Sequence, residues 1–405
     1  MSLSSPKLGT TAAPIALVIL LTSLVMVGQM STSMYLPSMP SVTDDLGADP
    51  GDVKLTMTVF LAAFAAAQLF FGPLSDRIGR RPALFVGLAL YLIGTAACML
   101  APNLTILIGG RFVQGFGACA GPAIARAVVR DRYERADAAR ILAYIGIAMA
   151  VGPALGPVLG GLLQVHFGWR ANFLALVLFG LAVWIAAVAG LSESLRMRDP
   201  DALSPTRLIR NYAALLGSRV FVGNMMVTAF IFGGMFSYAT GVPFVLIDQL
   251  KMSPDLFGTV FIFTMIGSVT GSTIASRAAA RVSGDTMTAI GGATALLGGM
   301  LMLIPMLLDV VTPATVVGSM MIFMVGFGIA APNSRAGAMA PFPQIAGAAS
   351  ALIGFAEMAM AALGSSLIAA LYDGTAVPMG AIVFTMGAAS ALSYLLVIHP
   401  IAARR

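Results

Sequence analysis

The sequence predicts an all-α integral membrane protein with twelve transmembrane helices in two bundles of six. Three observations carry this prediction. Of the 405 residues, 59% are of the AVILMFWYC types and only 10% are charged, whereas soluble domains carry about 25% charged residues. Twelve apolar stretches are long enough to cross a bilayer, and one long polar interval divides them into six and six. Too few polar side chains remain to cover a water-soluble surface.

Each predicted helix is an apolar run between polar breaks, and about 20 apolar residues cross the roughly 30 Å of hydrocarbon. The runs cover residues 13–36, 53–72, 83–101, 104–129, 138–165, 172–191, 220–247, 256–280, 286–308, 314–335, 347–371 and 378–399. The first run is longer than the apolar core of a signal peptide and lacks a convincing cleavage site, so we predict that it is a transmembrane helix.

The longest polar interval lies between the sixth and seventh runs. We therefore predict an N-terminal six-helix bundle over residues 1–191, a cytoplasmic central loop over 192–219 and a C-terminal six-helix bundle over 220–405. Many secondary transporters are built from repeated bundles of this kind. The layout alone leaves channels and membrane enzymes open.

The basic residues predict the orientation. If the N-terminus is cytoplasmic, nineteen of the 23 Lys and Arg residues, Arg335 among them, fall at cytoplasmic loops or termini. Three fall outside (Lys54, Arg170 and Lys251), and Arg111 lies within a span. Because cytoplasmic loops carry an excess of Lys and Arg, both termini are predicted to be cytoplasmic.

Several function classes are disfavoured. The net charge of +6 comes with only three lysines and no basic stripe, so no nucleic-acid partner is expected. Cys98 and Cys119 lie inside apolar runs without metal-ligand spacing, and His166 and His399 lie near the ends of spans, where neither a zinc site nor a catalytic triad could assemble. No phosphate-binding loop occurs. We expect no metal, no cofactor and no enzyme activity.

The loop after the second span reads GPLSDRIGRRP, from Gly72 to Pro82. Its two glycines, Gly72 and Gly79, permit close helix packing and a tight turn. Asp76 can sit near a helix N-terminus and pair with an arginine. Three arginines, Arg77, Arg80 and Arg81, would hold the loop at the cytoplasmic face. The alternative is that these arginines only mark the cytoplasmic side.

The fourth span contains RFVQGFGACAGP, beginning at Arg111 and including Gln114. Seven residues from the predicted start of the span, at 1.5 Å each, place Arg111 roughly 10 Å below the boundary. An arginine near the centre of a membrane helix costs about 2.5–3.5 kcal/mol. Arg111 is therefore either a functional charge or a hydrogen-bonding anchor between helices.

The fifth span repeats a Gly-Pro pair every four residues, as Gly152-Pro153 and Gly156-Pro157. This spacing places both pairs on one face of a helix, where proline kinks the helix and glycine admits a close neighbour. A packing kink without further function is the alternative.

These strings together resemble a known family. GPLSDRIGRRP closely resembles the loop motif of the major facilitator superfamily, and the strings beginning at Arg111 and Gly152 resemble antiporter motifs of its fourth and fifth spans. MYLPSMP at 34–40, GWRANF at 168–173 and GMFSYATGVPFVL at 234–246 resemble the bicyclomycin- and chloramphenicol-resistance (Bcr/CflA) branch of drug:proton antiporters. The resemblance covers essentially the whole chain and is stronger in its first half.

The resemblance implies the major facilitator fold and export of amphipathic small molecules or drugs across the bacterial inner membrane. The export would be proton antiport through alternating access, by a monomer in the lipid bilayer. It implies a proton-coupling role for Arg111 and an association of the fifth-span motif with export. It also implies a cytoplasmic latch, made by Gly72, Asp76, Arg77, Gly79, Arg80 and Arg126.

Two departures from the branch bear on the proton site. Ser33 occupies a position where the branch usually has aspartate, and Glu357 stands where glutamine is common. Ten residues from the start of its span, Glu357 lies about 15 Å deep, and it is the one carboxylate that we place in the membrane core. Desolvation there favours the neutral acid. We predict that the proton site has moved from the first span to Glu357, and that Glu357 and Arg111 couple transport to protons; the alternative is that Glu357 is a protonated packing residue.

The substrate cavity is predicted from polar and aromatic residues in the spans: Tyr35, Gln114, Phe232, Phe236, Tyr238 and Phe355. Aromatic stripes in helices more often serve packing. An uptake carrier or uncoupled facilitator of a small metabolite is the alternative function, and Ser33 is the main sequence argument for it. A membrane sensor that transports nothing is a more distant possibility.

Overall fold

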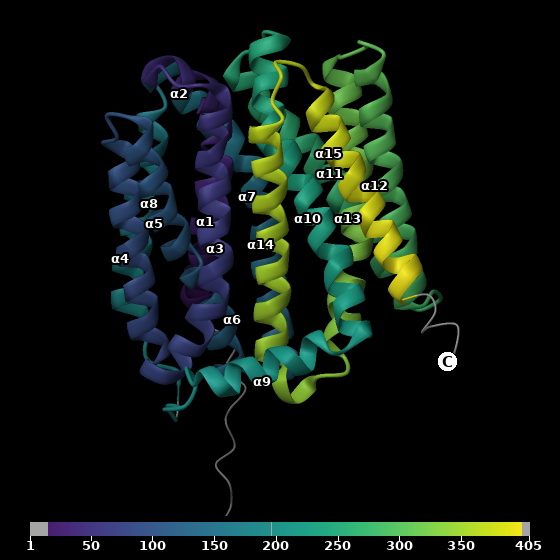
Figure 1. Ribbon diagram of the computed structural model, residues 1–405. Helices are drawn as coiled ribbons and strands as arrows, with labels where there is room; N and C mark the ends of the chain where they lie inside the picture. Colours follow the sequence, from purple (N-terminus) through teal and green to yellow (C-terminus); the bar gives the residue numbers. More distant parts are fainter. Residues whose placement is uncertain (1–14, 196, 399–405) are drawn as a thin grey trace, which may run out of the picture.

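The computed structural model describes residues 15–195 and 197–398, and within these ranges every regular element is helical. Twelve helical segments in them are long and apolar enough to cross a membrane, which confirms the twelve predicted spans. Figure 1 shows the helices of the first and second halves side by side. Both termini are predicted to be cytoplasmic, but residues 1–14 and 399–405 lie outside the described residues.

The helices of the first half surround a common core. They are α1 (Ile15–Ser33), η1 (Leu36–Ser38), α2 (Met39–Leu46), α3 (Pro50–Ile78), α4 (Arg80–Met99), α5 (Leu104–Ala118), α6 (Ala120–Arg132), α7 (Arg135–Phe167) and α8 (Arg170–Gly190).

The second half begins after an amphipathic connecting helix, α9 (Pro205–Leu216), which runs along one end of the molecule (Figure 1). We call this end the α9 face and the opposite end the far face. The remaining elements are α10 (Arg219–Pro243), η2 (Phe244–Gln249), α11 (Pro254–Ala278), α12 (Gly284–Leu307), α13 (Pro313–Met339), η3 (Pro343–Ile345), α14 (Ala346–Ala370), α15 (Val377–Ser393) and η4 (Tyr394–Ile398).

Three predicted spans are interrupted rather than continuous. The first passes through the 3₁₀ turn η1 into α2, in a stretch with prolines at 37 and 40. The fourth breaks at Cys119, between α5 and α6, three residues before Pro122. The seventh ends in the π-helical turn η2 directly after Pro243. Because proline cannot donate a backbone hydrogen bond, such positions loosen regular helix geometry.

Helix α7 contacts the chain's first span and helix α11 of the second half at glycine residues. A Cβ atom on Gly156 would lie 1.8 Å from Ser33 Oγ, and one on Gly160 would lie 2.1 Å from the Met34 carbonyl oxygen in the first half. A Cβ atom on Gly258 of α11 would lie 2.5 Å from the Val158 Cα. The fifth-span motif therefore brings α7 into close contact with α1 and α11, and α7 is continuous through its two prolines.

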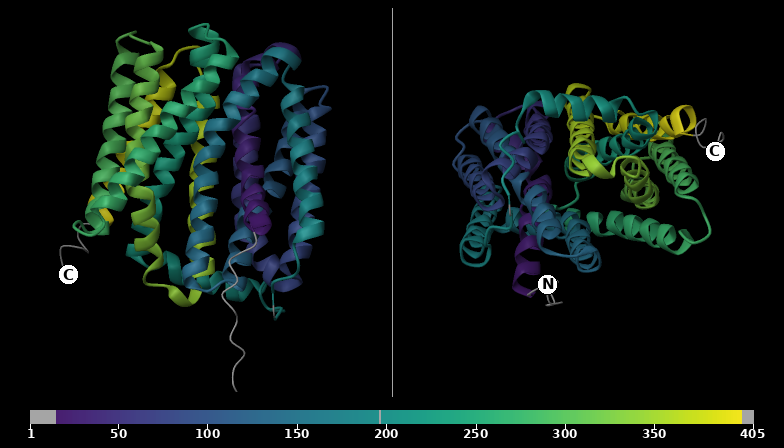
Figure 2. Two further views of the ribbon diagram at one scale, coloured as in Figure 1. Left: turned by 180° about the vertical axis from the view of Figure 1, so that it is seen from behind. Right: turned by 90° about the horizontal axis from the view of Figure 1, so that it is seen from below.

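The second contact between the halves is α3 against α14, which stand side by side at the centre of Figure 1. Thr58 Oγ1 donates a hydrogen bond to Ser365 Oγ at 2.9 Å. A Cβ on Gly51 would lie 3.1 Å from the Ala369 carbonyl oxygen near the far face, and one on Gly354 would lie 2.7 Å from Gln68 Oε1 nearer the α9 face. Figure 2 shows the two halves from two further directions.

We predict that Gly160→Ala destabilises the protein by roughly 1–3 kcal/mol, the usual effect of overpacking. The added methyl group meets a backbone carbonyl, so α1 and α7 must separate. Thermal unfolding of the purified protein in detergent measures the effect. Gly146→Ala on the same helix is the matched control, because nothing lies within 4 Å of its Cβ position. Equal melting temperatures for the two variants would contradict the close contact.

Candidate functional site

Glu357 forms a bidentate salt bridge with Arg335. Arg335 Nε donates to Glu357 Oε1 at 2.8 Å, and Arg335 Nη2 donates to Glu357 Oε2 at 2.8 Å. Glu357 is the twelfth residue of α14, about 16 Å along the helix from its start, and its side chain is only 5% exposed. Arg335 lies one turn before the end of α13 and remains 37% exposed. A guanidinium and a carboxylate in this arrangement form one of the stronger side-chain interactions.

The first half contributes a second guanidinium to this pair. Arg126 of α6 interacts electrostatically with both Arg335 and Glu357. The Phe232 ring of α10 lies 5.4 Å from the Arg335 Cζ. Two guanidinium groups and one carboxylate, from both halves of the molecule, therefore share this region. We call Arg126, Arg335, Glu357 and Phe232 the central charge cluster.

This geometry bears on three expectations. Arg126 was assigned to the cytoplasmic latch; it interacts electrostatically with Arg335 and Glu357, and its latch role stays a prediction. Arg335 was counted as a loop charge, yet it lies within α13 and bonds Glu357. The expectation of a neutral Glu357 considered desolvation alone. With Arg335 as its partner, loss of the proton leaves an ion pair rather than an isolated buried charge.

Arg111 is completely buried inside the first half and joins three helices. From α5, its Nη1 donates to the Ser31 carbonyl oxygen of α1 at 3.0 Å and to Gln114 Oε1 at 2.6 Å. Its Cζ lies 4.3 Å from the ring centroid of Phe60 on α3. Within the described ranges it forms no ion pair, and no contact joins it to Glu357. The geometry favours the anchor interpretation of Arg111.

Ser33 lies at the contact of α1 with α7. Its hydroxyl donates to the Gln29 carbonyl oxygen at 2.8 Å and approaches the Gly152 carbonyl oxygen at 3.4 Å. The position that carries aspartate in the resembling branch therefore packs on the fifth-span motif.

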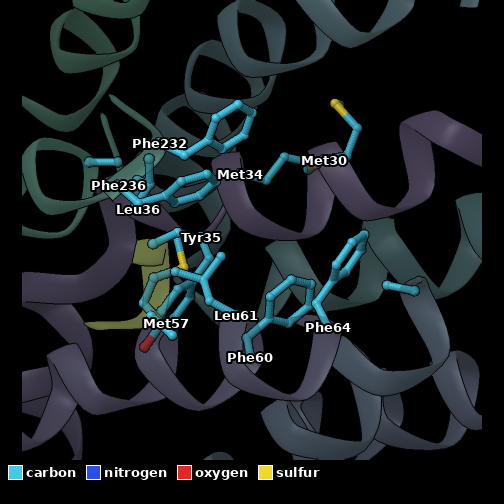
Figure 3. Packing of buried hydrophobic residues seen from close by; sticks show 14 of the residues in the cluster. Met30, Met34, Tyr35, Leu36, Met57, Phe60, Leu61, Phe64, Phe232 and Phe236 are labelled. Carbon is cyan, nitrogen blue, oxygen red and sulfur yellow. The ribbon is translucent and has the colours of Figure 1, made fainter. Parts of the chain in front are cut away.

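The predicted cavity residues separate into two groups. Tyr35, Phe232 and Phe236 belong to one apolar cluster that brings α1 and α10 together, as Figure 3 shows. Tyr238 is enclosed in the same cluster, and Gln114 is fully buried, where it donates to Thr95 Oγ1 at 3.0 Å.

Phe355 does not belong with them. It packs in a separate apolar cluster with Leu215 of α9 and Phe221 of α10. It is the tenth residue of α14, two positions before Glu357, and its assignment to the cavity stays a prediction.

The loop motif forms a network centred on Arg80. The Arg80 guanidinium bonds Asp76 through Nη1 and Asp131 through Nε, the latter at 2.8 Å, and it also donates to Ser75 Oγ at 2.7 Å. Asp131 belongs to α6, so the network joins α3, α4 and α6 within the first half. The resemblance implied a latch between the halves; in this conformation the side-chain contacts of Asp76 and Arg80 stay within the first half, and their backbone groups bond Asp199 and Glu193 of the central loop.

Glu193, just after α8, completes this network and was not anticipated. Its carboxylate accepts from the backbone N–H groups of Arg80 (3.0 Å), Arg81 (3.1 Å), Ser194 (2.9 Å) and Leu195 (3.0 Å). Gly79 makes this possible, because its φ of +109° directs the start of α4 toward the carboxylate, and a Cβ there would lie 2.6 Å from Glu193 Oε2. Partial burial raises the pKa of Glu193, but the backbone donors outweigh it and hold the pKa below its ordinary value.

The family model described as Major Facilitator Superfamily matches residues 21–365. An uncharacterized MFS-type transporter YdgK of Bacillus subtilis is 32% identical over 382 residues, covering 94% of each chain. Multidrug resistance protein D of Escherichia coli is 31% identical over 88% of each chain. A bicyclomycin resistance protein homolog of Haemophilus influenzae is 31% identical over 91% of this chain and 92% of its own.

Solved structures of low sequence identity share the fold. A peptide transporter POT in complex with sulfate has a TM-score of 0.78 at 17% identity and covers 99% of this chain and 97% of its own. The xylose transporter XylE of E. coli, in a partially occluded inward open conformation, has a TM-score of 0.72 at 13% identity, over 94% of this chain and 96% of its own. These likenesses establish the arrangement of the helices.

We predict that Arg335→Ala lowers stability by about 3 kcal/mol, the lower end of the range for a broken buried pair. Glu357→Gln should cost less, because the 37% exposed Arg335 can be hydrated whereas the 5% exposed Glu357 cannot. The double variant Arg335→Ala/Glu357→Gln should regain most of the loss. Thermal unfolding of the four proteins forms a double-mutant cycle, and simple additivity of the two effects would argue against the pair.

We predict that Glu193→Gln speeds hydrogen exchange at the amides of Arg80 and Arg81. The folded-state pKa of Glu193 lies below its ordinary value of 4.5, so its contribution is complete above that value and is lost as pH falls through the lower one. Exchange mass spectrometry, corrected for intrinsic rates, measures the change. Glu134→Gln, at an exposed helix start, is the control. Unchanged protection in Glu193→Gln would refute this role.

Proposed function

Because the chain belongs to the major facilitator superfamily, we propose that it exports amphipathic small molecules across the bacterial inner membrane by proton antiport. The chain is a transporter rather than an enzyme. Relatives that are about 31% identical over most of their length carry the names multidrug resistance protein D and bicyclomycin resistance protein homolog. These names support a drug or drug-like substrate for this chain.

The observation that carries the proposal is the Glu357–Arg335 pair. A carboxylate near the middle of a membrane-spanning helix is a functional-site candidate by default. Its partner remains 37% exposed, and we propose that protons and substrate reach the pair on the side of Arg335. Protonation of Glu357 would release Arg335, and re-ionisation would recapture it.

Alternating access requires that protonation of Glu357 shifts the equilibrium between the two arrangements of the halves. The central charge cluster contains Arg126 from the first half and Arg335 and Glu357 from the second. A ligand or proton shifts a conformational equilibrium only by its differential affinity for the two states. Neutralising Glu357 removes the negative charge that acts on Arg126, and the remaining repulsion between Arg126 and Arg335 favours separation of the halves at this level. The proton would thereby be coupled to the position of the halves.

The orientation and supporting roles follow from the charges. We place the α9 face in the cytoplasm, because the long arginine-bearing central loop lies there. Arg111 would hold α1, α3 and α5 as one rigid unit rather than carry protons. The Asp76–Arg80–Asp131 network would fix the cytoplasmic ends of α3, α4 and α6, and we propose that the transporter acts as a monomer.

We predict that Glu357→Gln loses most proton-driven export while membrane insertion is kept. Glutamine matches the neutral acid in size, but it cannot release a proton. Efflux of a fluorescent drug such as ethidium from vesicles with an imposed pH gradient measures the coupling, with expression matched. Glu134→Gln, an exposed glutamate outside the central charge cluster, should export at the wild-type rate. Wild-type gradient dependence in Glu357→Gln would overturn the assignment of the proton site.

An uncoupled facilitator or uptake carrier is the second candidate, favoured by Ser33 at the position where aspartate is common in the resembling branch. The same vesicles decide between the two. Collapse of the pH gradient with unchanged flux would remove antiport and leave facilitation.

A further inference from the structure

Lys54 is a buried cation that the proposed mechanism does not use. It is the fifth residue of α3, at the far face, and its side chain is 0% exposed. Within the described residues its Nζ has no hydrogen-bond partner. Ammonium groups are among the least often buried groups in proteins unless they are paired. The surroundings of Lys54 must therefore supply the compensation.

Two aromatic rings of the second half enclose the ammonium group. The Nζ lies 3.6 Å from the ring centroid of Phe244 and 3.1 Å from that of Tyr372. The two ring centroids are 5.9 Å apart and their planes are tilted by 58°, so the rings form two walls of a cage. Rings at such distances attract a cation through their negative faces.

Negative charge lies close to the cage. Asp248 in η2 interacts electrostatically with both Lys54 and Tyr372. Asp44 and Asp373, which are exposed at the same face, act on Asp248 and Tyr372 respectively. The two rings, Asp248 and Asp373 belong to the second half. Lys54 and Asp44 belong to the first half. The first half thus inserts its own ammonium group into a site on the second half.

We propose that Phe244, Tyr372 and Asp248 form a binding site for ammonium cations, that Lys54 occupies it when the far face is closed, and that a substrate carrying an organic ammonium group occupies it when the far face opens. This inference rests on the proposed alternating access and on the far face being the outer side. Opening moves α3 away from η2 and from the loop after α14. The emptied cage then faces the outer solution, beside carboxylates that attract cations.

The cage affects both the closure of the far face and the release of the substrate. Lys54 in the cage holds the far face closed in the conformation that admits substrate from the cytoplasm. An organic cation leaving through the far face competes with Lys54 for the cage, so it delays reclosure until it has left. The site thus favours amphipathic substrates that bear an ammonium group over neutral ones.

Choline binding to the purified full-length protein in lipid nanodiscs tests the site, with 3,3-dimethylbutan-1-ol as the uncharged probe of the same shape. Lys54→Ala empties the cage, so it should bind choline at least about tenfold more tightly than the wild type, in line with the strength of a desolvated cation–π contact. The neutral alcohol should bind neither protein. Adding Tyr372→Leu to Lys54→Ala should abolish the gain.

Lys251→Asn is the matched control. Lys251 also acts on Asp248 electrostatically but is exposed outside the cage, and asparagine tolerates its positive φ of 55°. If Lys251→Asn binds choline as tightly as Lys54→Ala, general charge rather than the cage is responsible and the proposal fails. Equal binding of the alcohol, or retained binding after Tyr372→Leu, would also overturn it.

A distance measurement tests the competition in the unaltered cage. Spin labels at Pro102→Cys and Val310→Cys report the separation of the halves at the far face, where both residues are exposed. Excess choline should displace Lys54 and lengthen this distance, and the alcohol should not. Choline binding with an unchanged distance would refute the competition. Both measurements work without transport, so their failure leaves the gradient-driven efflux test of the proposed function standing.

Discussion

A carboxylate that is buried midway along a membrane-spanning helix must have its charge compensated, and the organisation of the centre of this protein follows from that constraint. Glu357 obtains its compensation from Arg335, through two parallel hydrogen bonds of 2.8 Å. Arg335 belongs to the neighbouring helix of the same half, while Arg126 adds a further positive charge from the other half. The charge balance of the cluster therefore depends both on one proton and on the distance between the halves.

At the far face a buried cation is compensated by aromatic rings instead of by an ion pair. Lys54 has no carboxylate within ion-pair distance among the described residues and is held instead by the faces of two aromatic rings. Ring faces attract a cation without binding it as a geometrically fixed partner. A contact of this kind can be broken and remade during a transport cycle, and the released ammonium group is then stabilised by water.

The halves also meet through small residues. Close approaches at Gly51, Gly258 and Gly354 and the Thr58–Ser365 hydrogen bond belong to these contacts. Small residues let helix backbones approach closely without interlocking long side chains. Such surfaces can tilt against each other as rigid bodies, so the charged contacts at the two levels are the interactions that distinguish one conformation from another.

The sequence by itself determined the twelve spans, because backbone groups in lipid must be satisfied within helices and a helix that crosses the bilayer needs a long apolar run. It also located the acid of the core at Glu357 and indicated that Asp76 pairs with an arginine of its loop, which the structure identifies as Arg80. The tertiary structure decided the rest. The contacts that it decided join residues on different helices: Arg335 with Glu357, Arg126 with both through its charge, Phe355 with the cluster around Leu215 and Phe221, and Lys54 with Phe244 and Tyr372. Successive residues of a helix point about 100° apart, so such contacts depend on how each helix is rotated and packed, and hydropathy along a single chain does not contain that information.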